Sequence, residues 1–305
     1  MTKTERLLQL KKDRNAIILA HYYQDPDIQD VADFMGDSLA LAQHAQDTNA
    51  DVILFCGVHF MSETAKILNP NKKVLIPDLD AGCSLADSAS SHEFKQWVNN
   101  HPGHQLVSYI NCSAEVKAMS DIICTSSNAE KIINSIPESQ PILFAPDQFL
   151  GQHLIKKTKR DLVLWEGFCQ VHILFSLKEL IQLKIRHPKA QVTDHPECEQ
   201  RILSHSDFIG STTALIKYTQ SHQYSEFIVV TEPGVIHQMK KLNPQKNYIP
   251  LANQEGCACN ECPHMRLNTI DKMIQALETL SPEITLTSEL INKAKKPLLK
   301  MLELS

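Results

Sequence analysis

The sequence predicts an α/β fold of three αβα domains, each with a parallel sheet of three or four strands, arranged around a pseudo-threefold axis. Three observations predict it. Short apolar runs alternate with segments of helical apolar spacing, as in parallel sheets covered by helices. The alternation recurs three times along the 305 residues, and polar residues that follow the strands recur at nearly equal intervals. We place the domains at 1–88, 89–172 and 173–265, with C-terminal helices in 266–305 packed on the first domain.

The first predicted domain contains a charged N-terminal helix and three strands. Each strand is a bounded apolar run that is too short for a helix and ends in polar or turn-forming residues. Helices are predicted where the apolar spacing fits one face of a helix. The predicted strands are 15–20, 51–56 and 73–77, and the predicted helices are 1–14, 30–34, 39–48 and 61–68.

The second and third predicted domains repeat this order. Two further helices follow the third domain, with Ser281-Pro282 as the break between them. The second domain has apolar strands at 105–109, 142–145 and 161–165 and helices starting at 113 and 151. The third domain has strands at 191–193 and 227–230, a helix at 235–242 and a closing apolar segment at 248–251. The C-terminal helices are expected at 267–280 and 288–304.

Two triplets of residues carry the evidence for an internal repeat. His21, Tyr109 and His195 fall at matching strand ends, 88 and 86 positions apart. A second triplet of hydroxyl residues has the same two intervals, namely Ser38, Ser126 and Thr212. Chance rarely places two triplets in register with the strand pattern, so we infer a threefold repeat of small αβα units.

Composition and charge favour a globular protein acting on small molecules. Hydrophobic residues make up 43% of the chain, which is enough to bury a core, and the net charge is −5. Basic and acidic residues alternate without blocks, so we expect no nucleic-acid partner and no binding to anionic membranes. The charged N-terminus resembles no signal peptide, and no apolar run has the length of a membrane span. We therefore expect a cytoplasmic protein.

The nine cysteines indicate metal binding. An odd number in a chain without an export signal argues against a disulfide framework. Cys257, Cys259 and Cys262 lie within six residues, a spacing that fits a structural zinc site as well as part of an iron–sulfur site. Cys83 and Cys169 close the first and second domains as one thiol of this stretch closes the third, so the repeat supplies one thiol per domain. We expect the remaining cysteines to be packing residues: Cys56, Cys112, Cys124 and Cys198.

Hydroxyl, imidazole and carboxylate groups follow the predicted strands. Ligands of parallel sheets bind beyond the carboxyl ends of the strands, so three domains around one axis can direct these groups at one site. Taken singly, a serine or threonine before a helix is more often an N-cap, and a histidine or tyrosine ending a strand is more often a core residue. The candidates are His21, Tyr23, Ser38, Tyr109, Asn111, Ser126, His195, Glu197, Ser211 and Thr212.

Short motifs follow one another along the chain in a fixed order. They are HYYQ (21–24), GDSL (36–39), VHFMSETAK (58–66), AGCSLA (81–86), YIN (109–111), TS (125–126), GFC (167–169), HPEC (195–198), GST (210–212) and CPHM (262–265). Together, from about residue 15 to about residue 275, they resemble the quinolinate synthase family of NAD biosynthesis. A non-enzymatic binding protein or a structural zinc protein is the competing interpretation.

The resemblance implies an enzyme that condenses iminoaspartate with dihydroxyacetone phosphate to give quinolinate, phosphate and water. It implies a four-iron four-sulfur cluster with one open iron, held by Cys83, Cys169 and Cys262. On that basis we expect catalytic roles for Tyr23, Tyr109, His195 and Glu197. The residues expected to bind substrate are His21, Ser38, Tyr109, Ile110, Asn111, Ser126, His195, Pro196, Glu197 and Thr212. Besides the two substrates, we expect a transient contact with the enzyme that produces iminoaspartate.

Overall fold

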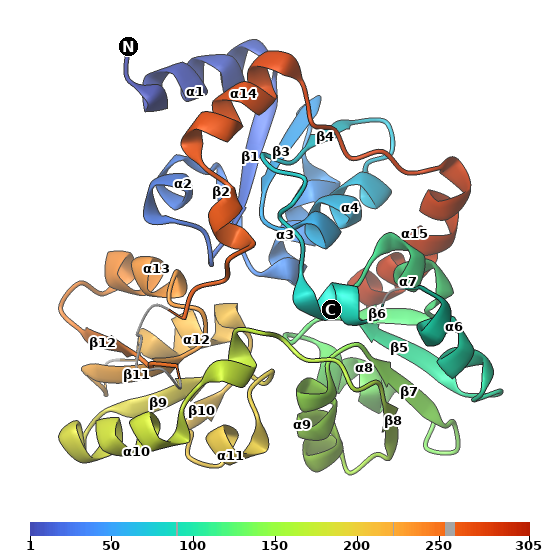
Figure 1. The fold of residues 1–305 in the computed structure, drawn as a ribbon, viewed down its shortest axis with the longest axis vertical. Coiled ribbons are helices and arrows are strands. Elements are labelled where there is room, and N and C mark those ends of the chain that lie inside the picture. Colours follow the sequence, from blue (N-terminus) through green and yellow to red (C-terminus); the bar gives the residue numbers. More distant parts are fainter. Residues whose placement is uncertain (90, 222, 254–259) are drawn as a thin grey trace.

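The computed structural model describes residues 1–89, 91–221, 223–253 and 260–305, and it contains three four-stranded sheets in which every strand pair is parallel. The sheets form three lobes around a common centre (Figure 1). This architecture confirms the predicted fold class. The first sheet has the order β2 (Phe34–Gly36), β1 (Ala16–His21), β3 (Val52–Cys56), β4 (Lys73–Leu75). The second has β6 (Ile122–Cys124), β5 (Gln105–Tyr109), β7 (Ile142–Ala145), β8 (Leu162–Leu164), and the third has β10 (Phe208–Ile209), β9 (Gln191–Asp194), β11 (Glu226–Val230), β12 (Asn247–Pro250).

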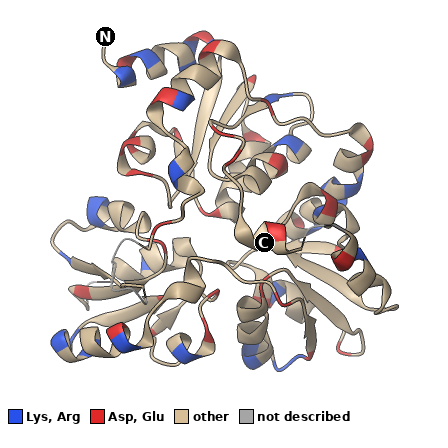
Figure 2. Ribbon diagram, viewed as in Figure 1, with Lys and Arg blue, Asp and Glu red and all other residues tan. Residues whose placement is uncertain are grey.

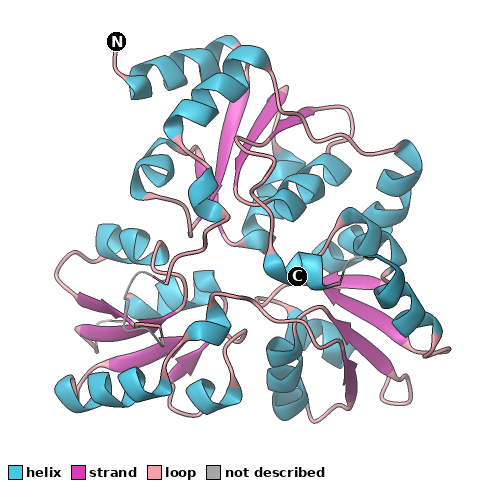
Figure 3. Ribbon diagram, viewed as in Figure 1, coloured by secondary structure: helices cyan, strands magenta, loops and turns pink. Residues whose placement is uncertain are grey.

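Helices flank each sheet (Figure 3). In the first lobe they are α1 (Lys3–Asp13), α2 (Pro26–Val31), α3 (Ser38–Asp47) and α4 (His59–Leu68). The chain then runs through α5 (Ser84–Ser88), α6 (Ser91–Asn99), α7 (Ala114–Met119), α8 (Ala129–Ser135) and α9 (Gln148–Thr158). The third lobe carries the 3₁₀ helix η1 (His172–Leu174), α10 (Leu177–Arg186), α11 (Gln200–Leu203), α12 (Thr212–Thr219) and α13 (Val235–Leu242). The C-terminal part contains the 3₁₀ helix η2 (Met265–Leu267), α14 (Ile270–Thr279) and α15 (Ser288–Glu303).

The strand register confirms the internal repeat. His21 pairs with Gly36 and Tyr109 pairs with Cys124, in both cases across fifteen positions of sequence. In the third sheet Asp194 pairs with Ile209 at the same separation, which places His195 one residue beyond, at the equivalent of His21. The three strand ends inferred from the sequence are therefore structurally equivalent.

A repeated aspartate holds the second strand of each sheet against the first. Asp33, Asp121 and Asp207 each accept a hydrogen bond from a backbone N–H fifteen residues earlier, at 2.8 Å in all three cases. Each aspartate also donates its own backbone N–H to the carbonyl of that same residue. The pattern fixes where the second strand begins, and it follows the 88 and 86 intervals of the repeat.

Two local predictions differ from the structure. The segment predicted as a helix at 30–34 is the end of α2 followed by β2, because Asp25 and Pro26 start the helix earlier and Asp33 ties the chain to β1. The second difference concerns the C-terminal helices. α14 packs on α1 and β3 as expected, whereas α15 lies chiefly against α7 and β6 of the second lobe and also touches α4. The domain boundaries at 88, 172 and 265 stay a prediction.

The core is built from both faces of the sheets. In β11, Ile228 and Val230 belong to one buried cluster and Phe227 and Val229 to another, so the strand is covered on both sides. The first two lobes share one continuous cluster that includes Leu298 of α15. Among the described residues, no helix combines the length and apolar character needed to cross a membrane. Lysines and arginines are interspersed with acids over the outer helices (Figure 2).

Candidate active site

The carboxyl ends of the strands of all three lobes meet at a central cavity. In each sheet the strand that comes first in the sequence lies between two other strands, and the chain connects to one of them on one side and to the next on the other side. This reversal of direction is the switch point at which α/β sheets bind ligands. The predicted residues that line this cavity are His21, Tyr23, Ser38, Tyr109, Asn111, Ser126, His195, Glu197 and Thr212, together with Cys83, Cys169 and Cys262.

Three candidates lie elsewhere. Ile110 is almost fully buried and belongs to the core shared by the first two lobes. Pro196 and Ser211 line a neighbouring pocket, which adjoins the central cavity at Asp37 and Ser126. Their side chains are not among those that line the central cavity, so any role in holding substrate there stays a prediction.

The hydroxyl triplet does not cap the helices that follow it. Ser38 and Thr212 are the first residues of α3 and α12, whose N-caps are Asp37 and Ser211. Ser126 lies ahead of α8, whose N-cap is Asn128. The capping interpretation is therefore wrong for these three residues, and their hydroxyls are available to the cavity.

Glu197 is the centre of the polar network. Its Oε1 accepts a hydrogen bond of 2.6 Å from the Tyr109 hydroxyl, and the carboxylate is 3% exposed. Its Oε2 lies 2.9 Å from Nδ1 of His172, and its Oε1 lies 3.9 Å from Nδ1 of His195. The His172 and His195 rings stack with their centroids 5.0 Å apart, and Nε2 of His195 is 3.3 Å from the Ser126 hydroxyl. Groups from the second and third lobes thus meet at one carboxylate.

Burial and this network set the protonation of the site. Burial lowers the pKa of His195 to about 3 and that of His21 to about 4, so both imidazoles are neutral near pH 7. Burial alone would raise the pKa of Glu197, but the two neighbouring imidazoles and the Tyr109 hydroxyl outweigh it and lower the pKa. Burial and Glu197 hold the pKa of Tyr109 well above its usual range. The site therefore pairs an ionised carboxylate with neutral proton donors and acceptors.

Tyr23 joins the first lobe to the third. Its hydroxyl lies 3.0 Å from Oγ1 of Thr212 and 2.7 Å from Oγ1 of Thr231. Thr231 in turn lies 3.0 Å from Nε2 of His172, so a chain of hydrogen bonds runs from Tyr23 to the imidazole beside Glu197. The backbone N–H of Tyr23 also donates to Nδ1 of His21. Such a chain fixes ring orientations and offers a route for protons.

The three candidate cluster thiols share one local arrangement. Cys83 caps α5, Cys169 precedes η1 and Cys262 precedes η2, so each sulfur sits at the start of a helical turn. Burial raises the pKa of each thiol, and backbone N–H groups two or three residues ahead of it, in the following turn, act in the opposite direction. The thiols are also close enough for Cys262 to raise the pKa of Cys83, and for both to raise that of Cys169. Thiols gathered in this way suit a cation that removes their protons.

A glycine shapes the turn before Cys169. A Cβ on Gly167 would lie 2.3 Å from the carbonyl oxygen of Pro146 and 2.3 Å from the hydroxyl oxygen of Ser88. Only glycine allows this close approach, which brings the loop of the second lobe against the end of the first.

The other described cysteines differ from these three. Cys56, Cys112, Cys124 and Cys198 are buried, and each belongs to a hydrophobic cluster, which confirms that they are packing residues. Cys83, Cys169 and Cys262 are only partly buried and line the cavity. The local zinc interpretation involves Cys257 and Cys259, which lie outside the described residues.

Sequence reasoning missed several polar residues of the cavity. His172 was not among the candidates, yet its Nδ1 lies 2.9 Å from Oε2 of Glu197. Asp37 lines the cavity while capping α3 and accepting from the Ser127 hydroxyl. Glu232 lies two residues beyond β11, as Asp147 lies two residues beyond β7. The repeat was the signal for this last pair, because both are buried acids at equivalent strand ends.

Glu232 and Arg266 clamp the Cys262 turn onto Tyr23. Oε1 of Glu232 accepts from the backbone N–H of Cys262 at 3.3 Å and from Nη2 of Arg266 at 2.6 Å. Arg266 also donates to the carbonyl oxygen of Tyr23 and pairs with Asp25. Burial raises the pKa of Glu232 to about 8, although the positive charge of Arg266 acts to lower it. The ionised form of Glu232 therefore depends on the Arg266 guanidinium.

Replacing Arg266 with alanine should destabilise the fold. Arg266→Ala leaves the fully buried Glu232 without its cation, which we expect to lower the free energy of unfolding by about 3 kcal/mol. Urea unfolding followed by circular dichroism measures this. Arg201→Ala is the control, because its ion pair with Glu199 is on the surface and should be worth less than about 1 kcal/mol. An equal loss of unfolding free energy in the two variants would show that the Glu232–Arg266 pair does not stabilise the fold.

Fold and site together define an α/β enzyme in which three repeated lobes share one active site lined by thiols, imidazoles and carboxyl groups. A sequence model of the family Quinolinate synthetase A protein matches residues 5–303. The chain belongs to the quinolinate synthase family.

Individual relatives agree with the family match. The quinolinate synthase of Trichodesmium erythraeum (strain IMS101) is 60% identical over 301 residues, covering 99% of this chain and 93% of that protein. Those of Nostoc punctiforme and Cyanophora paradoxa are each 60% identical over 296 residues, covering 97% of this chain and 91% and 90% of the relatives. The expectation of a quinolinate synthase of NAD biosynthesis is confirmed by these matches.

Proposed function

We propose that this chain makes quinolinate by condensing iminoaspartate with dihydroxyacetone phosphate, with loss of phosphate and water. The observation that carries the proposal is the meeting of one partly buried thiol from each lobe with the Glu197 network in a single cavity. Membership of the quinolinate synthase family supports the same reaction.

The three cavity thiols fit a four-iron four-sulfur cluster. Such clusters are held by cysteine thiolates, and hydrogen bonds to the sulfurs tune them. Cys83, Cys169 and Cys262 offer three thiols beside helical turns whose N–H groups favour the thiolate form. When bound, a cluster with three protein ligands supplies one iron that acts as a Lewis acid toward a substrate oxygen or nitrogen.

Glu197 and His195 are the acid–base pair of the proposal. Ring formation requires protons to leave the carbon atoms that form new bonds and to reach the departing hydroxyl groups. Glu197 is ionised and suited to accept a proton at Oε2, the oxygen not bonded to Tyr109. His195, neutral and hydrogen-bonded to Ser126, can donate or accept at its ring nitrogens. Glu197 can therefore act as the general base while His195 acts as the general acid.

Tyr109 and Tyr23 orient the substrate, and the hydroxyls of Ser38, Ser126 and Thr212 hold its charged ends. Tyr109 donates to Glu197, and Tyr23 is fixed between Thr212 and Thr231. Ser38 and Thr212 begin helices α3 and α12 at the cavity, so their hydroxyls and the nearby backbone N–H groups suit carboxylate or phosphate groups. His21, Asn111 and Ser126 complete the polar lining.

The reaction is tested directly with anaerobically purified protein. Iminoaspartate, generated in the assay from oxaloacetate and ammonia, and dihydroxyacetone phosphate are added together, and quinolinate is followed by mass spectrometry. We expect quinolinate and phosphate in equal amounts, and neither when one substrate is omitted. Phosphate release without quinolinate would contradict the proposed condensation. The cytoplasmic location and the transient contact with the enzyme that produces iminoaspartate stay predictions.

A further inference from the structure

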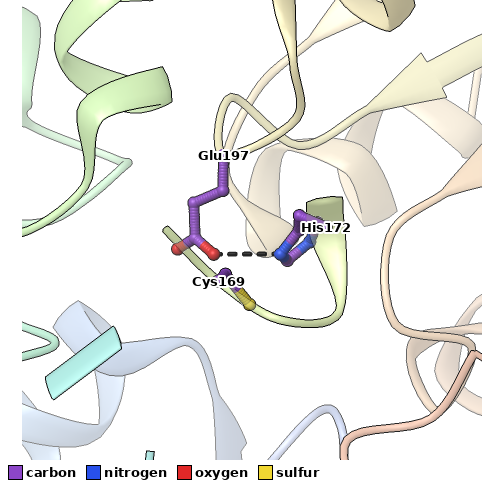
Figure 4. A group of neighbouring side chains, drawn as sticks. All are labelled: Cys169, His172 and Glu197. Atoms are coloured by element: carbon purple, nitrogen blue, oxygen red, sulfur yellow. Dashed lines mark ion pairs between the residues drawn. The ribbon is translucent and has the colours of Figure 1, made fainter. Parts of the chain in front are cut away.

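We infer that the chain, when it lacks a cluster, binds a single zinc ion through Cys169, His172 and Glu197. One ligand atom of each residue lies within 4.8 Å of the other two. Figure 4 shows the three side chains close together: Cys169 comes from the loop before η1, His172 from the start of η1 and Glu197 from the loop after β9. The site shares Cys169 with the proposed cluster, but its other two ligands are a nitrogen and an oxygen.

The ligand set matches the preferences of zinc. Sulfur, imidazole nitrogen and carboxylate oxygen are its common ligands, and three of them leave a fourth tetrahedral position open. In such a site, with bonds of ~2.0–2.3 Å, the ligand atoms lie roughly 3.3–3.8 Å apart. The observed separations need only small side-chain adjustments to reach these values.

His172 has an unused ring nitrogen directed into this site. The residue is 3% exposed, and its Nδ1 makes no hydrogen bond of normal geometry, although Oε2 of Glu197 is 2.9 Å away. Its other nitrogen, Nε2, is held by Thr231 at 3.0 Å. A histidine fixed through one nitrogen with the other free is the arrangement found for histidine ligands of metals.

Glu197 likewise has one oxygen held by a hydrogen bond and one oxygen free to bind a metal. Tyr109 occupies Oε1 with a hydrogen bond of 2.6 Å, which leaves Oε2 facing His172. Both residues therefore have an outer hydrogen-bond partner that orients them and a free ligand atom that points to the same place as the Cys169 sulfur.

Zinc bound here would compete with cluster assembly, because it occupies Cys169, one of the three proposed cluster ligands. This consequence rests on the proposed function, whereas binding of the ion does not. One zinc equivalent added to cluster-free protein should slow reconstitution with iron and sulfide, and a chelator should restore it.

The experiment compares ligand variants of the full-length, cluster-free chain. Zinc affinity is measured by competition with a chromophoric chelator, and Co²⁺ serves as a spectroscopic probe. His172→Ala and Cys169→Ser should each weaken zinc binding by at least ~10-fold. Cys83→Ala and Cys262→Ser are the matched controls and should bind zinc as the unmodified chain does, although neither can hold the proposed cluster. The Co²⁺ form should show sulfur-to-metal charge transfer that is lost only in Cys169→Ser.

Three results would overturn the inference. Equal weakening in Cys83→Ala and Cys169→Ser would place the ion among the three cluster thiols. Loss of zinc binding in Cys262→Ser, with no change of zinc affinity in His172→Ala, would place the ion in the 257–262 stretch. Absence of zinc binding to unmodified cluster-free protein with a native circular dichroism spectrum would exclude the site. If His172→Ala does not fold, His172→Gln replaces it, and the Co²⁺ spectrum of the unmodified chain tests the sulfur ligand independently.

Discussion

Cys83→Ala should give a colourless protein that forms no quinolinate. The variant removes one of three cavity thiols, each from a different lobe, and no other described cysteine lines the cavity to replace it. The fold should persist, because the neighbouring turn of α5 is formed by backbone hydrogen bonds. Visible absorbance after anaerobic purification and quinolinate formation are the two measurements.

Cys56→Ala is the matched control for this experiment. Cys56 belongs to the same lobe but is buried in the core beneath the sheet. Its loss should cost some stability through a small cavity while leaving colour and activity in place. A brown, active Cys83→Ala protein would show that Cys83 is not a cluster ligand.

Glu197→Gln should keep the cluster and lose turnover by about 10²-fold or more, the usual range for a lost acid–base group. The amide can still accept the Tyr109 hydrogen bond, so the geometry of the network is retained, but it cannot take up a proton. Iron content and visible absorbance report the cluster, and kcat under anaerobic conditions reports the chemistry.

Glu199→Gln controls for the loss of a nearby negative charge. Glu199 is two residues away, forms an ion pair with Arg201 on the surface and does not line the cavity. Its replacement should change kcat by less than about twofold. If Glu197→Gln behaves like this control, proton transfer in the reaction belongs to another group.

The repeat made much of the fold and part of the site predictable from the sequence. Apolar runs identified the strands, and the 88 and 86 intervals aligned His21, Tyr109 and His195, which the register shows to be equivalent. The same alignment related Cys83 and Cys169 to a thiol of the last stretch. Family motifs were needed to select Cys262 from that stretch, since spacing alone fits all three of its thiols equally.

Residues that act through tertiary contacts were not predictable from local pattern. β2 has only three residues and is defined by its pairing with β1, so periodicity cannot reveal it. α15 has an ordinary amphipathic sequence, and the choice between the first and second lobes depends on which apolar surface is left uncovered. His172 and Glu232 belong to the site through contacts with residues distant in the sequence. His172 lies against Glu197, and Glu232 accepts a hydrogen bond from the backbone N–H of Cys262.

The central claim is that three lobes contribute one thiol each to a single iron–sulfur cluster, and elemental analysis of anaerobically purified protein tests it most directly. Iron, acid-labile sulfide and zinc are measured per chain in the same sample. The account predicts about four irons and about four sulfides with no zinc. One zinc per chain without sulfide, retained in Cys169→Ser and lost in Cys262→Ser, would contradict it and would favour a structural zinc protein.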